Sequence, residues 1–385
     1  MDFGLTSEQQ MLVDSVRAFV EAELKPYEEE VERTNKVRPE LIQQIHAAAI
    51  KNGFYAANMP EELGGGGLDH VALTLMEREL GRTSFALQYA VARPSNILRA
   101  CQGEQIERYL LPAIRGERVE CLGLTEPNAG SDLRSMQTRA EADGDDFVIN
   151  GTKHFISYAD VADFIVLFAA SGVEETSKGA KKKITSFLVD KDTPGLDVRM
   201  GPHSVSHRGF HHCELVFNNC RVNKRQVLGE VHRGFDVANQ WLGATRLTVA
   251  AQCVGRAQRA MEMAAQWAAT RKQFGQTIGK FQGTSFKLAD MATEIEAANL
   301  LCLQTAWKTD QGTATDADYA MAKLFATEML ARVTDQTVQI FGGMGLMEEV
   351  GVERLWRDAR VERIWDGTSE IQRHIISRSV LRPLE

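Results

Sequence analysis

The 385-residue sequence lacks the long apolar runs, positive charge and clustered cysteines that mark several large classes of protein. No stretch approaches the ~18 consecutive apolar residues that a membrane-spanning helix requires. The formal net charge of −8 argues against binding nucleic acid or an anionic membrane through overall charge. The cysteines have no metal-type spacing, and a chain of this length needs no disulfide bonds to fold. They are Cys101, Cys121, Cys213, Cys220, Cys253 and Cys302.

The first residues, MDFGLTSEQQ, contain no cationic segment followed by an apolar run, so we expect no signal peptide. Together with the dispersed cysteines, this favours a reducing, cytoplasmic location. A composition of 44% hydrophobic and 25% charged residues is typical of a soluble globular enzyme. The length predicts two or three domains.

Residues 1–118 have the periodicity of helices. Thr6 and Gln9 have the spacing of a capping box, and a further helix is predicted from Val71 to Leu80. The segment PEELGGGGLD at 60–69 predicts a loop between helices. It is not a phosphate loop, because no apolar strand precedes it and no Gly-Lys-Ser/Thr follows.

Residues 119–228 change to a period of two, which predicts a small antiparallel β domain. Asp143-Gly144 is typical of a hairpin turn. The charged segment Glu174 to Lys183 predicts an exposed loop. The predicted strands include 147–149, 154–157, 164–169, 184–189 and 213–217.

Residues 229–385 return to long helical periodicity, with one apolar stripe along Leu288, Met291, Ile295, Ala298 and Cys302. Several such stripes predict an antiparallel four-helix bundle, and any surplus apolar face predicts subunit packing. The predicted fold is therefore α+β, with an N-terminal helical domain, a central antiparallel β domain and a C-terminal helical bundle.

The segment IWDGTSEIQRHIISR at 364–378 places Asp366 directly before a Gly-Thr turn and a helix. An Asp at this place can cap the helix or act as a base. Four other segments carry further polar and glycine-rich patterns. They are CLGLTEPNAGSDL at 121–133, INGTKHFIS at 149–157, the 244–282 run that contains RKQFG and ends in FQ, and QIFGGMG at 339–345.

Together these five segments closely resemble the acyl-CoA dehydrogenase flavoproteins, from residue 121 to the C-terminus. The resemblance implies FAD as cofactor, with Arg271, Phe274, Gln339 and Gly343 directed to the FAD of a neighbouring subunit. It implies that Glu370 stands where the family usually has Gln. The residues it assigns to FAD are Leu122, Leu124, Thr125, Gly130, Ser131, Phe155, Ser157, Arg271, Phe274, Gln282, Gln339, Gly342, Gly343, Thr368 and Glu370.

The resemblance makes Asp366 the catalytic base that removes the α-proton of an acyl thioester, one methylene shorter than the usual Glu. Burial among apolar groups should raise the pKa of such an Asp. Some relatives place the base at the position of Thr245, which offers no carboxylate here. The residues assigned to substrate are Arg93, Ser131, Thr245, Arg246 and Gly367.

The resemblance implies dehydrogenation of an acyl-CoA to the trans-2-enoyl-CoA, electron transfer to an electron-transfer flavoprotein, and a homotetramer. The Asp at 366 leaves a nitroalkane oxidase-like or crotonobetainyl-CoA reductase-like enzyme open, as well as a non-catalytic acyl-CoA-binding flavoprotein. DNA binding, which some relatives show, is disfavoured by the negative charge. No metal site is expected at His203, His207, His211 and His212, because no carboxylate cage accompanies them.

Overall fold

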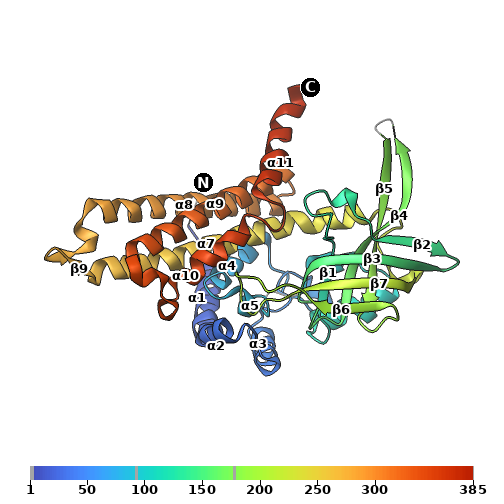
Figure 1. Ribbon diagram of the computed structural model, residues 1–385, viewed down its shortest axis with the longest axis horizontal. Coiled ribbons are helices and arrows are strands. Elements are labelled where there is room, and N and C mark those ends of the chain that lie inside the picture. The colour runs from blue at the N-terminus through green and yellow to red at the C-terminus, as the bar shows by residue number, and fades with distance from the viewer. Residues whose placement is uncertain (1–3, 92–93, 177–178, 385) are drawn as a thin grey trace.

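The computed structural model describes residues 4–91, 94–176 and 179–384. Helices, then a sheet, then further helices follow one another along the chain, so the predicted α+β fold is confirmed (Figure 1). We propose domain bounds of 1–118, 119–228 and 229–385. They are supported by the strand content, which begins at Glu120 and reaches Leu228 before the first long helix.

The N-terminal helices begin with the predicted capping box. The Thr6 side chain accepts from the Gln9 backbone at 3.2 Å, and the Gln9 side chain accepts from the Thr6 backbone at 3.0 Å. The helix predicted at 71–80 is α4, which is capped by Asp69. These helices are α1 (Ser7–Phe19), α2 (Glu28–Thr34), α3 (Pro39–Lys51), α4 (His70–Leu80), α5 (Phe85–Gln88) and α6 (Leu111–Ile114).

The central sheet has the strand order β6-β7-β3-β2-β4-β5-β8, with β1 paired to β4. Its pairings are antiparallel except at β4, which pairs in parallel with β1 and, at one position, with β2. The strands are β1 (Glu120–Gly123), β2 (Arg139–Asp143), β3 (Asp146–Ser157), β4 (Phe164–Thr176), β5 (Gly179–Asp190), β6 (Leu196–Met200), β7 (His212–Asn223) and β8 (Val227–Leu228).

Strand β4 shows how the sheet joins the helices. Phe164, Val166 and Phe168 pack into the core shared with the N-terminal helices. The alternate residues Ile165 and Leu167 pack on the other face, inside the sheet's own core. This period of two places one face of the sheet against the helices.

The prediction of a loop at Glu174 to Lys183 is wrong. Within this segment, residues 174–176 and 179–183 extend the β4 and β5 arms of a hairpin, with Glu174 opposite Lys181. Opposite charges on facing strands stabilise such a pair, so the ladder continues beyond the apolar residues. The arms project from the sheet (Figure 1).

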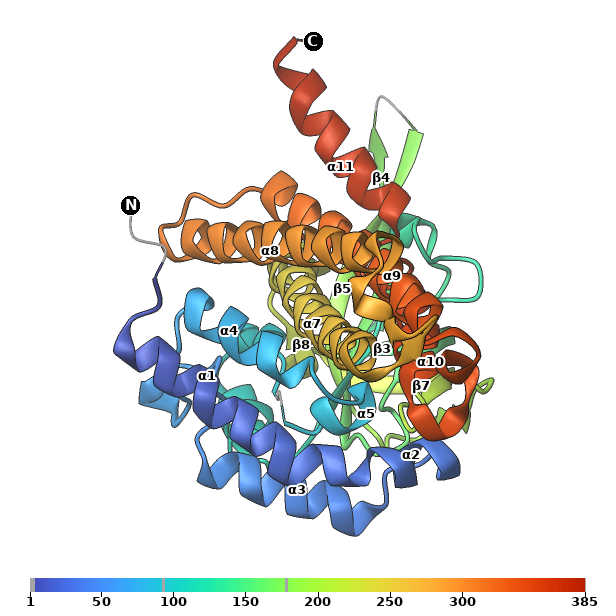
Figure 2. The same cartoon turned by 90° about the vertical axis from the view of Figure 1, so that its left-hand side faces the viewer.

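The C-terminal helices pack along one another, and the predicted stripe on α8 is buried at Met291, Ile295, Ala298 and Cys302. A short hairpin of β9 and β10 joins α7 to α8 at the end remote from the sheet, whereas α11 projects from the body (Figures 1 and 2). The elements are α7 (Gly234–Thr270), β9 (Lys272–Gln273), β10 (Gln276–Thr277), α8 (Gln282–Asp310), α9 (Asp316–Phe341), α10 (Val352–Glu362) and α11 (Ser369–Leu381).

All six cysteines are buried free thiols. No helix within the described ranges combines the length and apolarity needed to cross a membrane.

Candidate active site

A cavity of about 860 Å³ lies where the N-terminal helices, the sheet, α7 and the turn between α10 and α11 meet. Twelve of the predicted site residues line it, and we call them the cavity group. They are Leu122, Leu124, Thr125, Gly130, Ser131, Phe155, Ser157, Thr245, Arg246, Asp366, Gly367 and Thr368. Four stretches of chain that are distant in sequence are thus brought to one site. Arg93 lies outside the described residues.

The turn that follows β1 is held by buried ionic groups. Lys153 is fully buried, and its Nζ donates to Leu124 O at 3.0 Å and to Glu126 Oε1 at 2.7 Å. Burial lowers the pKa of Lys153 to about 8, against the opposing charge of Glu126. The Thr125 carbonyl accepts from His154 N at 2.9 Å. These contacts fix Thr125 and leave its side chain at the cavity wall.

The end of β3 supplies an aromatic ring and a hydroxyl. Phe155 has a φ of +55° and is 57% exposed, an unusual combination for a large apolar side chain. Ser157 Oγ lies 3.1 Å from His212 Nδ1. Burial lowers the pKa of His212 to about 4, so this imidazole is neutral near pH 7. No sequence pattern predicts His212 at this site.

Asp366 does not cap α11, so the helix-cap interpretation of this residue is wrong. Thr368 is the cap, and its hydroxyl accepts from Ile371 N at 3.3 Å. Asp366 instead occupies a left-handed turn with a φ of +51°, followed by Gly367 at +89°. Such backbone strain in a non-glycine residue is frequent at functional sites.

Two buried side chains hold the backbone around Asp366. Lys323 Nζ donates to Trp365 O and to Gly367 O, each at 2.8 Å. Gln372 Nε2 donates to Gly367 O at 2.8 Å and to Asp366 O at 3.2 Å. Glycine is favoured at position 367 because of its positive φ, and a Cβ there would also lie 2.7 Å from Gln372 Nε2. The turn is held by its backbone carbonyls.

The Asp366 carboxyl has a pKa raised to about 6. Burial is the main cause, Lys323 lowers the pKa, Glu362 raises it, and Arg246 lowers it. A pKa close to the working pH suits a general base. Arg246 is itself buried, and its Nε has no hydrogen-bond partner in the described chain. That orphaned guanidinium nitrogen suits an anionic or carbonyl group of a ligand.

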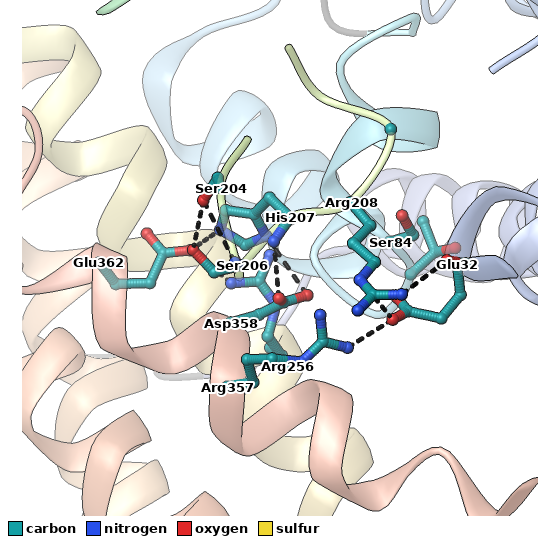
Figure 3. Close-up of polar contacts among 12 residues, drawn as sticks. Glu32, Ser84, Ser204, Ser206, His207, Arg208, Arg256, Arg357, Asp358 and Glu362 are labelled. Carbon is teal, nitrogen blue, oxygen red and sulfur yellow. Dashed lines mark hydrogen bonds and ion pairs between the residues drawn. The ribbon is translucent and has the colours of Figure 1, made fainter. Parts of the chain in front are cut away.

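Behind this turn lies a buried ionic network (Figure 3). Glu362 Oε1 accepts from Arg256 Nη1 at 2.5 Å and lies 3.1 Å from His207 Nε2. Its other oxygen accepts from Trp365 Nε1 at 2.7 Å. The Asp358 carboxylate accepts from His207 N at 2.7 Å. The network ties the residue before Asp366 to α7 and to the loop that carries His207.

The charges in this network support one another. Burial lowers the pKa of His207, but the charges and hydrogen bonds of Asp358 and Glu362 outweigh it and raise the pKa. Burial raises the pKa of Glu362, whereas Arg256 and His207 lower it more strongly. The His207 ring also stacks on Trp365 with centroids 5.0 Å apart. Glu362 is therefore held as an anion near Asp366.

Six predicted site residues lie elsewhere, and we call them the helix-end group. They are Arg271, Phe274, Gln282, Gln339, Gly342 and Gly343, all exposed and none lining the cavity. The Trp267 ring stacks on Phe341 with centroids 4.8 Å apart and so joins the ends of α7 and α9. The six residues lie at these two ends, in the β9–β10 hairpin and at the start of α8. Arg271 follows Arg246 by 25 residues, which is roughly 38 Å of helix. The group therefore cannot contact the cavity of its own chain directly.

Two residues of the helix-end group have unusual surroundings. Phe274 is 94% exposed and has a φ of +49°, whereas the Arg271 guanidinium lies 5.9 Å from the Trp267 ring centroid. Glu370, in the first turn of α11, is also exposed and does not line the cavity. Its own backbone N–H is the main cause of a lowered pKa. All three side chains are thus exposed and remain accessible to a ligand or to another subunit.

The cavity group fits the flavin part of FAD. A Cβ at Gly130 would meet no atom within 4 Å, which leaves the backbone accessible to a phosphate group. Thr125 and Ser157 supply hydroxyls, and Phe155 supplies an exposed ring face. Planar heteroaromatic cofactors use such a mixture of apolar faces and few polar groups. Across the described part of the chain, no His, Cys, Asp and Glu side chains form a group suited to a metal ion.

The fold and the cavity fit one class of flavoprotein, and comparison with known proteins leads to the same class. Models of the acyl-CoA dehydrogenase N-terminal, middle and C-terminal domains match residues 6–117, 121–220 and 232–381. The chain therefore belongs to the acyl-CoA dehydrogenase family, whose members are FAD-dependent oxidoreductases.

Three relatives illustrate the range of the family. The "Probable acyl-CoA dehydrogenase YngJ" of Bacillus subtilis is 39% identical over 99% of this chain and 100% of its own. The caffeyl-CoA reductase-Etf complex subunit CarC of Acetobacterium woodii is 35% identical over 98% of this chain and 99% of its own. The structure of butyryl-CoA dehydrogenase from Megasphaera elsdenii is 34% identical in sequence and has a TM-score of 0.90. The match covers 99% of this chain and 100% of that one.

Proposed function

We propose that this chain oxidises an acyl-CoA thioester to the trans-2-enoyl-CoA, with Asp366 as the base. The observation that carries the assignment is a carboxyl group with a pKa of about 6, held at the wall of the cavity by a strained turn. The family resemblance and the dehydrogenases among the relatives support the reaction class. FAD, when bound, supplies the acceptor for the hydride that leaves the β-carbon.

The turn can bind a thioester oxygen as well as take a proton. The carbonyl of Trp365 points at Lys323. In a trans peptide the N–H lies opposite the carbonyl, so the Asp366 N–H points away from Lys323. The Asp366 N–H is suited to donate a hydrogen bond to the thioester oxygen, on which negative charge develops as the α-proton leaves. One turn thus supplies the base and a hydrogen bond to the developing enolate.

The helix-end group and Glu370 have roles that extend beyond one chain in this proposal. Arg271 and its neighbours contact the FAD of an adjacent subunit in a homotetramer, which explains why they are exposed and remote from their own cavity. Glu370 and Thr368 border the cofactor phosphates or ribose. Electrons pass to an electron-transfer flavoprotein, as the name of the Acetobacterium relative suggests for that protein. We place the enzyme in the cytoplasm.

An anaerobic titration tests the reaction. The purified yellow protein is mixed with a panel of acyl-CoA esters and with nitroalkanes, and the flavin absorbance is followed. We expect at least one acyl-CoA to bleach the flavin. Bleaching by a nitroalkane and by no acyl-CoA would refute the proposal and favour a nitroalkane oxidase.

The reverse direction is a second candidate, because one relative is named as a subunit of a caffeyl-CoA reductase-Etf complex. The same turn would then return the α-proton to an enoyl-CoA. This candidate predicts that photoreduced protein is reoxidised faster by enoyl-CoA than oxidised protein is bleached by the matching acyl-CoA. Equal or slower reoxidation would exclude it.

A further inference from the structure

A polar pair lies in the wall of the same cavity, on helices α4 and α7. Gln252 Nε2 donates to Glu77 Oε2 at 2.8 Å, and both side chains are buried, with 4% and 8% exposed. Within residues 4–91, 94–176 and 179–384, Glu77 forms no ion pair. Burial raises the pKa of Glu77 to about 7 against the Gln252 hydrogen bond. A buried carboxyl without a cation is costly unless a ligand satisfies it.

The cavity wall also contains unused hydrogen-bonding capacity. In the described chain, Gln252 Oε1 has no partner, and neither amide atom of Gln88 has one, although Gln88 is fully buried. Both residues line the cavity. Buried side-chain amides are satisfied in the large majority of cases. Three polar side chains on three helices therefore present donors and acceptors to whatever occupies this space.

The pair is fixed in place by close helix packing. A Cβ at Gly81 would lie 2.4 Å from Gln252 O, and one at Gly255 would lie 1.7 Å from Arg78 O. Helices α4 and α7 therefore touch closely at Gly81 and Gly255, and they lie side by side in both views (Figures 1 and 2). This close packing fixes the distance between the two helix backbones that carry Glu77 and Gln252.

The pair also stands at a defined distance from the reacting centre. Thr245, Val249 and Gln252 all line the cavity and recur at helical spacing on α7. Gln252 is six residues beyond Arg246, whose charge acts on Asp366. That spacing is roughly 9 Å of helix. A group that reaches Gln252 is thus several bonds away from the carbons beside the thioester.

We propose that Glu77, Gln88 and Gln252 select an acyl-CoA whose acyl group carries a neutral hydroxyl remote from the thioester. This inference rests on the proposed function of the cavity. A hydroxyl both donates and accepts, so it can donate to Gln252 Oε1 or Glu77 and accept from the Gln88 amide. A carboxylate would be repelled by Glu77. A cation would leave the Gln88 donor unpaired.

The test uses straight-chain acyl-CoA esters, each matched in length by its ω-hydroxy, ω-amino and ω-carboxy derivatives. Flavin reduction gives kcat/KM, and calorimetry on the oxidised Asp366→Asn protein, which should bind the esters but reduce its flavin only slowly, gives the dissociation constants. We expect one ω-hydroxy ester to exceed the plain ester of the same length by about tenfold or more in both measurements.

Variants identify the residues responsible. Glu77→Leu and Gln252→Leu should each remove most of the hydroxyl preference and improve use of the plain ester. The matched control is Glu262→Leu, which changes an exposed residue of α7 outside the cavity and should leave the preference unchanged. Glu77→Gln keeps the size of the side chain and should retain part of the preference. A wild-type flavin spectrum in each variant checks that the fold is intact.

The outcomes are distinct. A preference for the plain, ω-amino or ω-carboxy ester at every length overturns the inference, whereas the proposed function survives. An unchanged hydroxyl preference in both leucine variants also overturns it. If no ester bleaches the flavin, the proposed function fails. The calorimetric comparison of hydroxy and plain esters then still decides whether the pair selects a hydroxyl.

Discussion

The cavity group and the helix-end group differ in whether buried side chains of the same chain surround and hold them. Around Asp366, buried side chains such as Lys323, Gln372 and Glu362 hold the turn within a single chain. At the other end of α7, Arg271 and Phe274 are exposed, and Phe274 is held in a strained backbone conformation. In the proposed function, one chain contains the reaction site, whereas part of cofactor binding needs the surface of a second chain.

The strongest test of the cavity group is Asp366→Asn. Loss of the base should slow flavin reduction by about 10³-fold while the protein stays yellow. Anaerobic stopped-flow absorbance measures the rate. The control is Asp335→Asn, which makes the same change at an exposed position of α9. Reduction of Asp366→Asn at the normal rate would remove Asp366 from the mechanism.

The matching test of the helix-end group is Arg271→Gln. Loss of a charged hydrogen bond to a phosphate should weaken FAD binding by about tenfold or more, without changing the rate of reduction in protein that retains flavin. Flavin retention during dialysis measures the affinity. Lys272→Gln alters the adjacent exposed cation and serves as the control. Equal retention in the two variants would show that the helix-end group is ordinary surface.

The pH dependence of flavin reduction also distinguishes the cavity group from the helix-end group. Asp366 must be ionised to accept a proton, and its pKa is raised to about 6. The rate should therefore be constant above this value and fall about tenfold per pH unit below it. Arg271→Gln should leave the midpoint unchanged. A rate independent of pH between 5 and 8 would contradict the assignment of the base.

The smallest effect is expected from Lys323→Met. The carbonyls of Trp365 and Gly367 would lose their donor, which should lower the free energy of unfolding by about 1–3 kcal/mol. Because Lys323 lowers the pKa of Asp366, its loss should also move the midpoint of the rate profile to higher pH. Denaturant unfolding and the rate profile measure the two effects. Lys280→Met, at an exposed position, should change neither.

Local patterns made much of the fold and the motif positions predictable. The capping box at Thr6, the helix at 71–80 and the stripe along α8 depend on neighbours within one element. The charged segment at 174–183 is predicted wrongly because a run of charges is typical of a solvated loop, whereas residues 174–176 pair with residues 179–181 as the end of the long hairpin of β4 and β5.

The supporting side chains at the site could not be predicted in the same way. Lys323, Glu362 and Glu77 each belong to a helical sequence, where a charged residue usually marks a solvated face. Only the tertiary fold turns them inward, beside Asp366 or into the cavity wall. An Asp before Gly-Thr likewise predicts a helix cap, but the structure gives that role to the next hydroxyl, Thr368.

The length of α7 has a consequence for how this enzyme behaves in solution. If the exposed far end of one chain completes the cofactor site of another, flavin binding and subunit association become linked equilibria. Dilution would then release flavin and subunits together, and added FAD would restore assembly. Specific activity would depend on protein concentration even with saturating substrate.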